Sequence, residues 1–393
     1  MAKLIDITGK SLSGEWGTDD ETGDGIPVLR TTNFTNEGVV NYNDVVTRTI
    51  TKKNIADKFL RKGDIIIEKS GGSDKFPVGR VIYFDGEEKT YLFNNFTGLL
   101  RVKNQDEWYP KYIFYSLYAN YKRGGTRAFE NKTTGLHNLK TDDYVSRYEV
   151  AEIDKTEQIL ICEKLNKLYE IIKLRRQELQ LLDELIKARF VELFGDPIKN
   201  PKGWEVVTIG DIVTEVRYGT SKPAVEGGKY PYLRMNNLTV DGHLDLKDLK
   251  YIDIPDDEME KCVVRKGDVL FNRTNSIELV GKTAVFDLPE DMVIAGYIIR
   301  VRLNERLLPE IFSQYMNLEA LKDILRAMAK GAVNQANINA QELQSIKVYV
   351  PDMEVQKQFI KMKEQVDKSK VAIQAALDKS QLLFDSLMQK YFG

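Results

Sequence analysis

The chain has only two histidines and two cysteines among its 393 residues. His137 and His243 are too few for a histidine metal cluster, and they give no support to a Ser-His-Asp triad. Cys162 and Cys262 are too few for a disulfide framework and too isolated for a thiolate zinc site. We therefore expect no metal in this chain, the histidines in loops, and both cysteines as small core residues.

The chain also lacks an excess of positive charge. Its 57 Lys and Arg residues face 59 Asp and Glu residues, and the net charge is −2. A free-standing nucleic-acid binder usually carries a basic excess, because neutralising phosphates dominates the affinity. If this chain binds DNA, its basic residues must be concentrated locally, or a partner must supply part of the phosphate contact.

Long apolar runs are absent as well. No segment reaches the roughly 18 to 20 apolar residues that a membrane span requires. Lys3, Asp6 and Lys10 interrupt the N-terminal region before the apolar core of a signal peptide can form. We therefore expect a cytoplasmic protein that has no membrane partner.

What the chain does have is an internal repeat. "RKGDIII" begins at Arg61, and "RKGDVLF" begins at Arg265, 204 positions later. "PVLRTTNFT" at 27–35 matches "PYLRMNNLT" at 231–239 in the same register, and further matches follow at slightly shorter intervals. The sequence therefore predicts two copies of a unit of about 200 residues, too long a period for a solenoid. Within it, "RKGD" reads as a turn before a central strand, since glycine makes a tight turn inexpensive.

Each copy changes character near its end. The first 150 residues or so alternate β-branched and aromatic runs with Gly, Asn and Asp, a pattern typical of strands. The last part shows apolar residues three and four apart, from Ile161 to Leu193 and from Val355 to Leu387, which predicts two helices with coiled-coil seams. Each helix should run about 38 residues, or roughly 55 Å, with Asp154 at one start and Gly195 as a stop. A helix of that length is longer than a small domain is wide, so it cannot bury all of its seam residues against one domain. We therefore expect the two helices to bury these residues against each other in an antiparallel pair.

Several segments resemble catalytic motifs and fail on inspection. "GKT" at 281–283 has Ser276 where a P-loop requires glycine, and "GKS" at 9–11 has Leu4 there. Paired acids such as Asp19 and Asp20 lie in polar segments that look like solvated loops. We find no nucleophile with a base and no glycine-rich cofactor loop, so we expect no catalysis and no cofactor in this chain.

The remaining candidate chemistry is DNA binding by locally basic, amide-rich segments. "YKRGGTRAFENK" at 121–132 and its counterpart at 326–339 place cations beside amides, and "LRTTN", "LRMNN" and "FNRTNS" add more. Arg and Lys suit phosphates, while Asn and Gln suit adenine edges. A solvated surface loop is the better interpretation of one such segment taken alone, and the correspondence of two basic, amide-rich segments makes the two interpretations about equal. The candidate DNA-binding residues are Arg30, Thr31, Asn33, Lys122, Arg123, Arg127, Asn131, Lys132, Arg234, Asn236, Asn237, Arg273, Asn275, Lys330, Asn334 and Gln335.

The order and duplication of these features resemble the specificity subunits of type I restriction-modification enzymes. The resemblance rests on the "GDI" opening, the "P-x-LR" segments, "KGD", "VG[KR]", and "LFGDP" followed by "PKGWE", and it covers essentially the whole chain. It implies two target recognition domains that read a bipartite, gapped, asymmetric DNA site. It also implies that the helices set the gap and dock two modification subunits, which use S-adenosylmethionine, with restriction subunits in some complexes.

These interpretations define an expected α+β architecture. Two strand-rich domains related by a pseudo-two-fold axis alternate with two long antiparallel helices that form an intramolecular coiled coil. The expected segments are target recognition domains at 1–151 and 197–350 and helical regions at 152–196 and 351–393. Two alternatives remain open: a helical scaffold protein without DNA specificity, and a nuclease with dispersed carboxylates.

Overall fold

The computed structural model describes residues 1–133, 136–332 and 335–393, with the side chains of 132–133, 330–332 and 335 outside the description. By its internal contacts the chain forms two compact units. Unit 1 contains Met1–Arg176 and Ala375–Gly393, and unit 2 contains Gln177–Gln374. Each long helix therefore contributes one part to each unit.

Unit 1 is built from small sheets. A four-stranded antiparallel sheet has the order β2-β10-β6-β8, and a second one has the order β3-β5-β4-β9 with β4 and β9 parallel. A three-stranded sheet has the order β11-β12-β7, and β1 pairs with β13. The strands are β1 (Ala2–Lys3), β2 (Leu12–Ser13), β3 (Thr18–Asp19), β4 (Ile26–Leu29), β5 (Val46–Thr49), β6 (Ile65–Glu68), β7 (Ser70–Gly72), β8 (Val81–Tyr83), β9 (Leu92–Phe93), β10 (Thr97–Leu100), β11 (Glu130–Thr133), β12 (Leu136–Leu139) and β13 (Glu149–Val150).

Unit 2 repeats this topology except at one edge strand, since β3 lies beside β5 in unit 1 whereas β18 lies beside β22 in unit 2. Its sheets have the orders β15-β23-β19-β21, β17-β16-β22-β18 and β20-β25-β24, and β14 pairs with β26. The strands are β14 (Glu205–Thr208), β15 (Val213–Tyr218), β16 (Tyr230–Leu233), β17 (Lys250–Ile252), β18 (Val263–Val264), β19 (Val269–Asn272), β20 (Thr274–Asn275), β21 (Thr283–Val285), β22 (Met292–Ile294), β23 (Ile298–Leu303), β24 (Lys330–Ala332), β25 (Gln335–Asn337) and β26 (Lys347–Val350). This correspondence confirms the duplication, and the fold is α+β as expected.

Short helices connect these strands in both units. In unit 1 they are α1 (Leu4–Thr8), η1 (Thr31–Asn33), η2 (Ala56–Lys58), α2 (Pro110–Lys122), η3 (Gly125–Phe129) and α3 (Thr141–Arg147). In unit 2 they are α5 (Ile209–Ile212), η4 (Met235–Asn237), α6 (Asp256–Cys262), α7 (Pro309–Met316), α8 (Glu319–Met328) and α9 (Ala340–Gln344).

The repeated "RKGD" phrase forms the same turn in both units. Gly63 and Gly267 have φ values of 91° and 94°, a region that favours glycine because a Cβ would be strained there. In unit 1 the Asp64 carboxylate accepts a hydrogen bond of 2.8 Å from the Arg61 N–H and closes the turn. The buried interior strand β6 follows in unit 1, and β19 follows in unit 2. The prediction of a turn before a central strand is confirmed.

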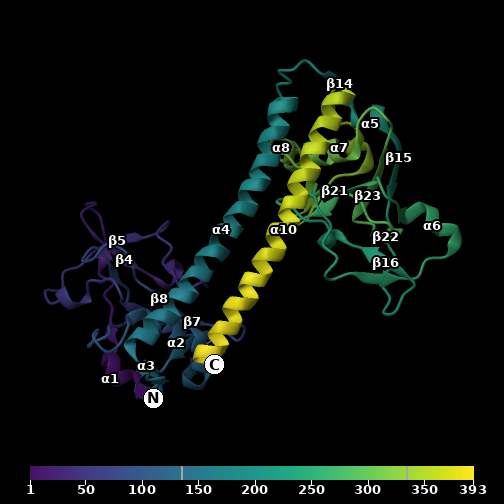
Figure 1. The fold of residues 1–393 in the computed structure, drawn as a ribbon. Helices are drawn as coiled ribbons and strands as arrows, with labels where there is room; N and C mark the ends of the chain where they lie inside the picture. The colour runs from purple at the N-terminus through teal and green to yellow at the C-terminus, as the bar shows by residue number, and fades with distance from the viewer. Residues whose placement is uncertain (134–135, 333–334) are drawn as a thin grey trace. The chain divides into compact units, whose positions relative to one another are not determined.

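The two long helices are α4 (Lys155–Phe194) and α10 (Met353–Phe392), drawn in teal and yellow in Figure 1. Each has 40 residues, which corresponds to about 60 Å at 1.5 Å per residue. The predicted ends are confirmed, because the Asp154 carboxylate accepts from the Thr156 N–H at 2.8 Å and Gly195 has a φ of 87°. Within the described residues, none of the helices combines the length and apolar character that crossing a membrane requires.

The helices pack against each other inside each unit. In unit 2 the Phe359 ring of α10 lies 5.2 Å from that of Phe190 on α4, and Lys370 forms an ion pair with Asp183. Residue numbers rise on one helix as they fall on the other, so this pairing is antiparallel. In unit 1 the Arg175 guanidinium donates to the Ser380 hydroxyl and to the Ala376 carbonyl. Arg175 and Ser380 are polar residues that interrupt the apolar seams of α4 and α10, and their side chains bond to each other.

One detail of the predicted seam is wrong. Leu383 was expected in the seam of α10, but it is 50% exposed, and its neighbour Phe384 is 8% exposed instead. Leu377, which the heptad pattern left out, is buried as well. Leu383 and Phe384 lie three and four residues after Ser380, so both continue the spacing of three and four, and spacing alone does not choose between them.

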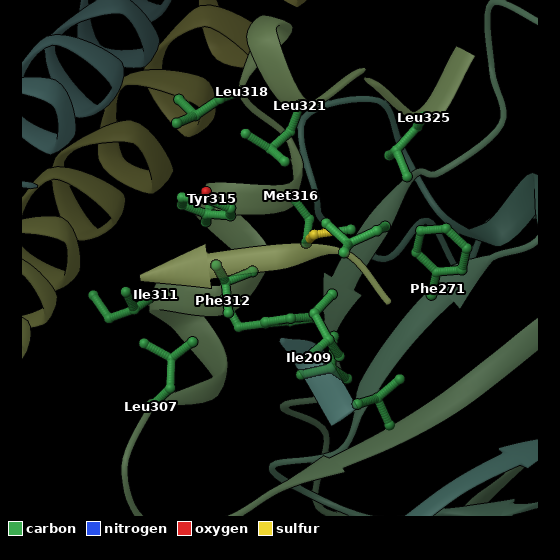
Figure 2. Close-up of a cluster of buried hydrophobic side chains, with 14 of the residues drawn as sticks. Ile209, Phe271, Leu307, Ile311, Phe312, Tyr315, Met316, Leu318, Leu321 and Leu325 are labelled. Carbon is green, nitrogen blue, oxygen red and sulfur yellow. The ribbon is translucent and has the colours of Figure 1, made fainter. Parts of the chain in front are cut away.

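The core of unit 2 joins the helices to the sheets. Figure 2 shows part of this cluster, with Phe271 of β19 near Leu325 of α8, and Phe312 of α7 near Ile209 of α5. Phe190 and Phe194 of α4 belong to the same cluster. This packing fixes the long helices to the strand-rich part of unit 2.

Candidate nucleic-acid interface

The "LRTTN" segment of unit 1 forms the turn η1 directly after strand β4. Asn33 is 1% exposed, and its side-chain oxygen accepts from the Arg30 N–H at 2.8 Å. Its amide nitrogen donates to the carbonyls of Asn41 and Asp44, both at 3.0 Å. The side chain of Asn33 is therefore committed to holding the turn rather than to a ligand.

The "LRMNN" segment of unit 2 forms the equivalent turn η4. Asn237 is 2% exposed, accepts from the Arg234 N–H at 2.8 Å, and donates to the Asp245 carbonyl at 2.8 Å. The Arg234 guanidinium bonds Asp248 at 2.8 Å. The repeated asparagine is thus explained by the same backbone requirement in both copies.

The other candidates in these two turns differ in accessibility. Arg30 pairs with Asp44 at 2.9 Å, an arrangement equivalent to that of Arg234. Thr31 is partly buried, whereas Asn236 is exposed. Asn236 is therefore the best placed of the six "LR" candidates to meet a ligand.

A basic residue anchors each of these turns from a neighbouring strand. In unit 1 the Arg80 guanidinium donates to the carbonyls of Thr31 and Phe34, both at 2.9 Å. In unit 2 the buried ammonium of Lys282 donates to the carbonyls of Met235 and Leu238, at 2.7 and 2.6 Å. The "GKT" lysine is therefore used inside the fold, which agrees with rejecting a P-loop.

The basic segment of unit 1 ends in a hairpin. Asn131 is exposed on β11 and lies opposite Asn138 of β12, and β12 in turn pairs with β7. Lys132 follows on β11, with its side chain outside the described residues. Arg127 is exposed in η3 and donates to the carbonyls of Asp74 and Lys75, at 3.1 and 3.4 Å.

Two other candidates from this segment have partners elsewhere in unit 1. The Lys122 ammonium lies 5.6 Å from the ring centroid of Tyr118. The Arg123 guanidinium donates to the Phe392 carbonyl, where a cation also complements the negative end of helix α10. Arg123 therefore stabilises a helix end and is less available to phosphates than its sequence context suggests.

The equivalent hairpin of unit 2 is formed by β24 and β25. Lys330 lies on β24 and Gln335 on β25, with both side chains outside the described residues, and Asn334 lies wholly outside them. Strand β20 pairs with β25 and carries Asn275, whose amide donates to the Asn272 side chain at 2.8 Å. Arg273 directly precedes β20. The structure thus brings together the candidates from two segments that are about 60 residues apart in the sequence.

The two hairpins have the same register but different chemistry. Asn131 pairs with Asn138, which pairs with Ser70, and Lys330 pairs with Asn337, which pairs with Thr274. Asn131 and Lys330 therefore occupy equivalent positions. At the next paired positions Lys132 and His137 of unit 1 correspond to Gly331 and Ala336 of unit 2. The expectation that His137 lies in a loop is wrong, because it is buried on strand β12 beside Glu130. The strand position that Asn131 and Lys330 share is therefore asparagine in one copy and lysine in the other.

Unit 1 also contains a cavity of about 390 Å³ beside the long helices. Its lining includes Tyr83, Phe114, Tyr115, Tyr118, Tyr169 and Phe384, together with charged residues of both signs. No cysteine, serine or histidine is among the lining residues. The cavity is an aromatic hollow, and its lining does not include the nucleophile and base of a hydrolase.

Metal and thiol chemistry add no further site in the described part of the chain. No group of three or more His, Cys, Asp or Glu residues is arranged to hold a metal there. Cys162 and Cys262 are buried and unbonded to each other, as predicted. Burial raises the pKa of the Cys162 thiol to about 12, which keeps it protonated and unreactive near neutral pH.

Comparison with known families agrees with this geometry. Residues 201–380 match the family model described as the type I restriction modification DNA specificity domain. The putative type I restriction enzyme MjaX specificity subunit of Methanocaldococcus jannaschii is 31% identical over 171 residues, which are 42% of this chain and 40% of that protein. The EcoKI specificity subunit of Escherichia coli K12 is 24% identical over 397 residues, covering 94% of this chain and 82% of that protein.

Solved structures share the fold over the full chain. The S subunit of a type I restriction-modification system from M. genitalium has a TM-score of 0.60 at 18% identity, covering 100% of this chain and 95% of that one. A chain from a study of the assembly and conformational transition of a type I restriction-modification system has a TM-score of 0.58 at 17% identity, with coverage of 100% and 96%. The duplicated α+β fold of this chain is therefore shared with these two structures. The chain is similar to specificity subunits of type I restriction enzymes, and its residues 201–380 match the DNA specificity domain of type I restriction-modification systems.

The sequence analysis missed two exposed aromatic residues near the hairpins. Phe96 is 55% exposed and Tyr297 is 50% exposed, and both lie just before a buried strand. The available signal was their spacing of 201 positions, which lies within the drift of the repeat. Neither position stands out in the sequence, because strands commonly alternate aromatic and polar residues.

Proposed function

We propose that this chain is the recognition subunit of a type I restriction-modification complex and reads a bipartite, gapped, asymmetric DNA target. The observation that carries the proposal is the pair of equivalent hairpins with different side chains. Two copies of one scaffold suit two half-sites, and different residues at equivalent positions suit different bases in each. The chain recognises DNA and leaves methylation and cleavage to its partners.

The proposed division of the chain follows from this function. Residues 1–151 and 197–350 are the two target recognition domains, and 152–196 and 351–393 are the helical regions. In this proposal Asn131, which is exposed, and Lys330 and Gln335 at the hairpin of unit 2 contact base edges. Arg127 and Lys132 contact phosphates, while the buried amides of Asn33 and Asn237 support the turns beside them.

The partners in this proposal are two modification subunits that carry S-adenosylmethionine, with restriction subunits in some complexes. Several apolar residues of the long helices support a docking role, because they remain exposed within their own unit. Leu174 of α4 is 60% exposed in unit 1, and Val371 of α10 is 71% exposed in unit 2. Exposed apolar residues mark an interface where they form a contiguous group, and Ile171, three residues before Leu174 on α4, is 40% exposed. Failure to copurify with the cognate methyltransferase subunits would favour the scaffold alternative.

The helices also set the gap between half-sites in this proposal. Each helix is a continuous 40-residue element, and removal of seven residues shortens a helix by about 10 Å, or roughly three base pairs of DNA. Removing one heptad from each helix should shorten the methylated gap without changing the half-site bases. An unchanged gap would refute the spacer role.

The main test is to map methylated sites in cells that express the chain with its methyltransferase subunits. The expected result is one gapped, non-palindromic motif. Asn131→Ala should relax the bases of one half-site, and Lys330→Ala those of the other, because each loses one reading contact. Asn54→Ala changes an exposed asparagine of unit 1 and serves as the matched control. A continuous or palindromic motif, or one unaffected by both hairpin variants, would count against the proposal.

A further inference from the structure

The two exposed aromatic residues occupy structurally equivalent places. The Phe96 carbonyl accepts a hydrogen bond of 2.8 Å from the Lys69 N–H in unit 1. The Tyr297 carbonyl accepts one of 3.0 Å from the Arg273 N–H in unit 2. Each unit therefore exposes one large ring at the same turn, next to one basic residue. Single exposed apolar residues are ordinary, but a repeated one in the same place requires an explanation.

The basic residue of each pair is also held in an equivalent way. The Lys69 ammonium donates to the Ser13 hydroxyl at 2.9 Å, and the Arg273 guanidinium lies 5.0 Å from the ring centroid of Tyr218. Ser13 pairs with Gly98 on β10, and Tyr218 pairs with Ile299 on β23, so the two partners occupy matching strand positions. The residue that contacts the cation is serine in unit 1 and tyrosine in unit 2, but both residues occupy the same strand position.

Both cations have bonding capacity left for a ligand. Arg273 makes one long hydrogen bond, of 3.5 Å to the Gly296 carbonyl, and no ion pair within the described residues. Burial lowers the pKa of Lys69, which indicates that its ammonium is already partly stripped of water. A cation that is already partly dehydrated loses less hydration free energy when it meets a phosphate.

Each pair lies at the base of a hairpin. The Lys69 carbonyl accepts from the Leu139 N–H at 2.8 Å at the end of β12, and the Arg273 carbonyl accepts from the Ile338 N–H at 2.9 Å just after β25. The pairs are therefore continuous with the strands that carry the proposed base-reading residues. A ligand that contacts the hairpin passes close to the cation and the ring.

We propose that Phe96 with Lys69, and Tyr297 with Arg273, are two DNA-anchoring pairs that position the hairpins without reading the sequence. The ring packs against the sugar or base surface of its half-site, and the cation contacts a phosphate. The hairpins carry different side chains in the two units, whereas the anchoring pair consists of one aromatic and one basic residue in both units. Features shared by readers of different half-sites cannot specify bases and are suited to positioning. This inference rests on the proposed DNA-recognition function.

The test uses the full chain assembled with its methyltransferase subunits and a duplex that contains the methylated motif. Phe96→Ala and Tyr297→Ala should each weaken binding about tenfold, within the range for loss of a nucleotide–aromatic contact. Lys69→Met and Arg273→Met should each lower the slope of log affinity against log salt by about one, because one phosphate contact is lost. The motif methylated in cells should stay the same for all four variants.

The control variants change exposed residues of unit 2. Tyr251→Ala removes a tyrosine that is 44% exposed, and Lys266→Met removes an exposed lysine of the "RKGD" turn. Both should bind like the unaltered chain, and all variants should keep the same thermal unfolding midpoint. Unaltered affinity and salt slope in the four anchoring variants would overturn the inference, and so would a changed motif. Absence of motif-specific binding by the unaltered complex would instead refute the proposed function.

Discussion

The side chain of Gln356 attaches the start of α10 to unit 2, so replacing it measures how much this attachment stabilises the unit. Gln356 lies in the first turn of α10 and is 0% exposed. Its side-chain oxygen accepts from the Leu308 N–H at 2.9 Å, and its nitrogen donates to the carbonyls of Arg306 and Pro351, at 3.0 and 2.8 Å. Gln158 makes the matching three bonds at the start of α4 in unit 1. The repeated glutamine is therefore a clamp between a helix start and a loop of the same unit.

Gln356→Leu keeps the approximate size of the side chain and removes all three hydrogen bonds. Each buried bond contributes about 1 kcal/mol net, and each partner left unsatisfied costs about 1–3 kcal/mol, so the total loss is about 3 kcal/mol or more. The apolar leucine side chain recovers about 1 kcal/mol through burial, which leaves an expected loss of about 2–4 kcal/mol. For a unit of this size that loss lowers the unfolding midpoint by roughly 4–16 °C.

The assay is differential scanning calorimetry of the full chain, supported by hydrogen exchange at the Leu308 amide. Gln356→Leu should lower one transition and accelerate exchange at Leu308, because that amide loses its acceptor. Gln365→Leu, at an exposed position of the same helix, is the matched control and should change stability by no more than about 0.5 kcal/mol. A loss below about 1 kcal/mol for Gln356→Leu, or equal losses in the two variants, would refute the reasoning.

Two further predictions follow from buried polar groups of unit 2. Burial lowers the pKa of Lys322 from its usual 10.5 to about 7, so between about pH 7 and 10.5 the unfolded chain binds more protons than the folded one. Stability should therefore rise with pH across that window, by at most about 1.4 kcal/mol per pH unit, and Lys322→Met should flatten this rise in calorimetry at stepped pH. Asn237→Ala should cost about 2–3 kcal/mol in denaturant unfolding, because the Arg234 N–H and the Asp245 carbonyl lose their buried partner. Asn236→Ala, in the same turn but exposed, should cost little, and equal costs would contradict the structural role of Asn237.

The repeat made much of the fold predictable from the sequence. Gly63 and Gly267 are required by the same left-handed turn, so the two "RKGD" phrases were correctly placed before central strands. The caps at Asp154 and Gly195 marked the helix ends for a similarly local reason. Turns and helix caps depend on a few neighbouring residues, so they can be predicted from short sequence patterns. The duplication allowed patterns of one copy to be checked against the other.

The candidate site was less predictable, because a polar side chain looks the same in a sequence whether its partner is DNA or its own backbone. Asn33 and Asn131 are both asparagines in amide-rich segments. The first is 1% exposed and holds a turn, whereas the second is exposed on a hairpin strand. The role of Arg123 is equally hard to predict from the sequence, because its partner is the carbonyl of Phe392, 269 positions away. Such partners depend on tertiary packing, which no local spacing encodes.

Comparing the two units position by position separates requirements of the fold from requirements of recognition. Asn33 and Asn237 are identical and buried, as the fold demands, and Gln158 and Gln356 follow the same rule. Asn131 differs from its equivalent Lys330 although the pairing of their strands is the same. A fold requirement would have kept these two residues alike, and the proposed reading of two different half-sites gives a reason for the difference. Hairpin register identical in both units, combined with side chains that differ, is the arrangement that an asymmetric target requires.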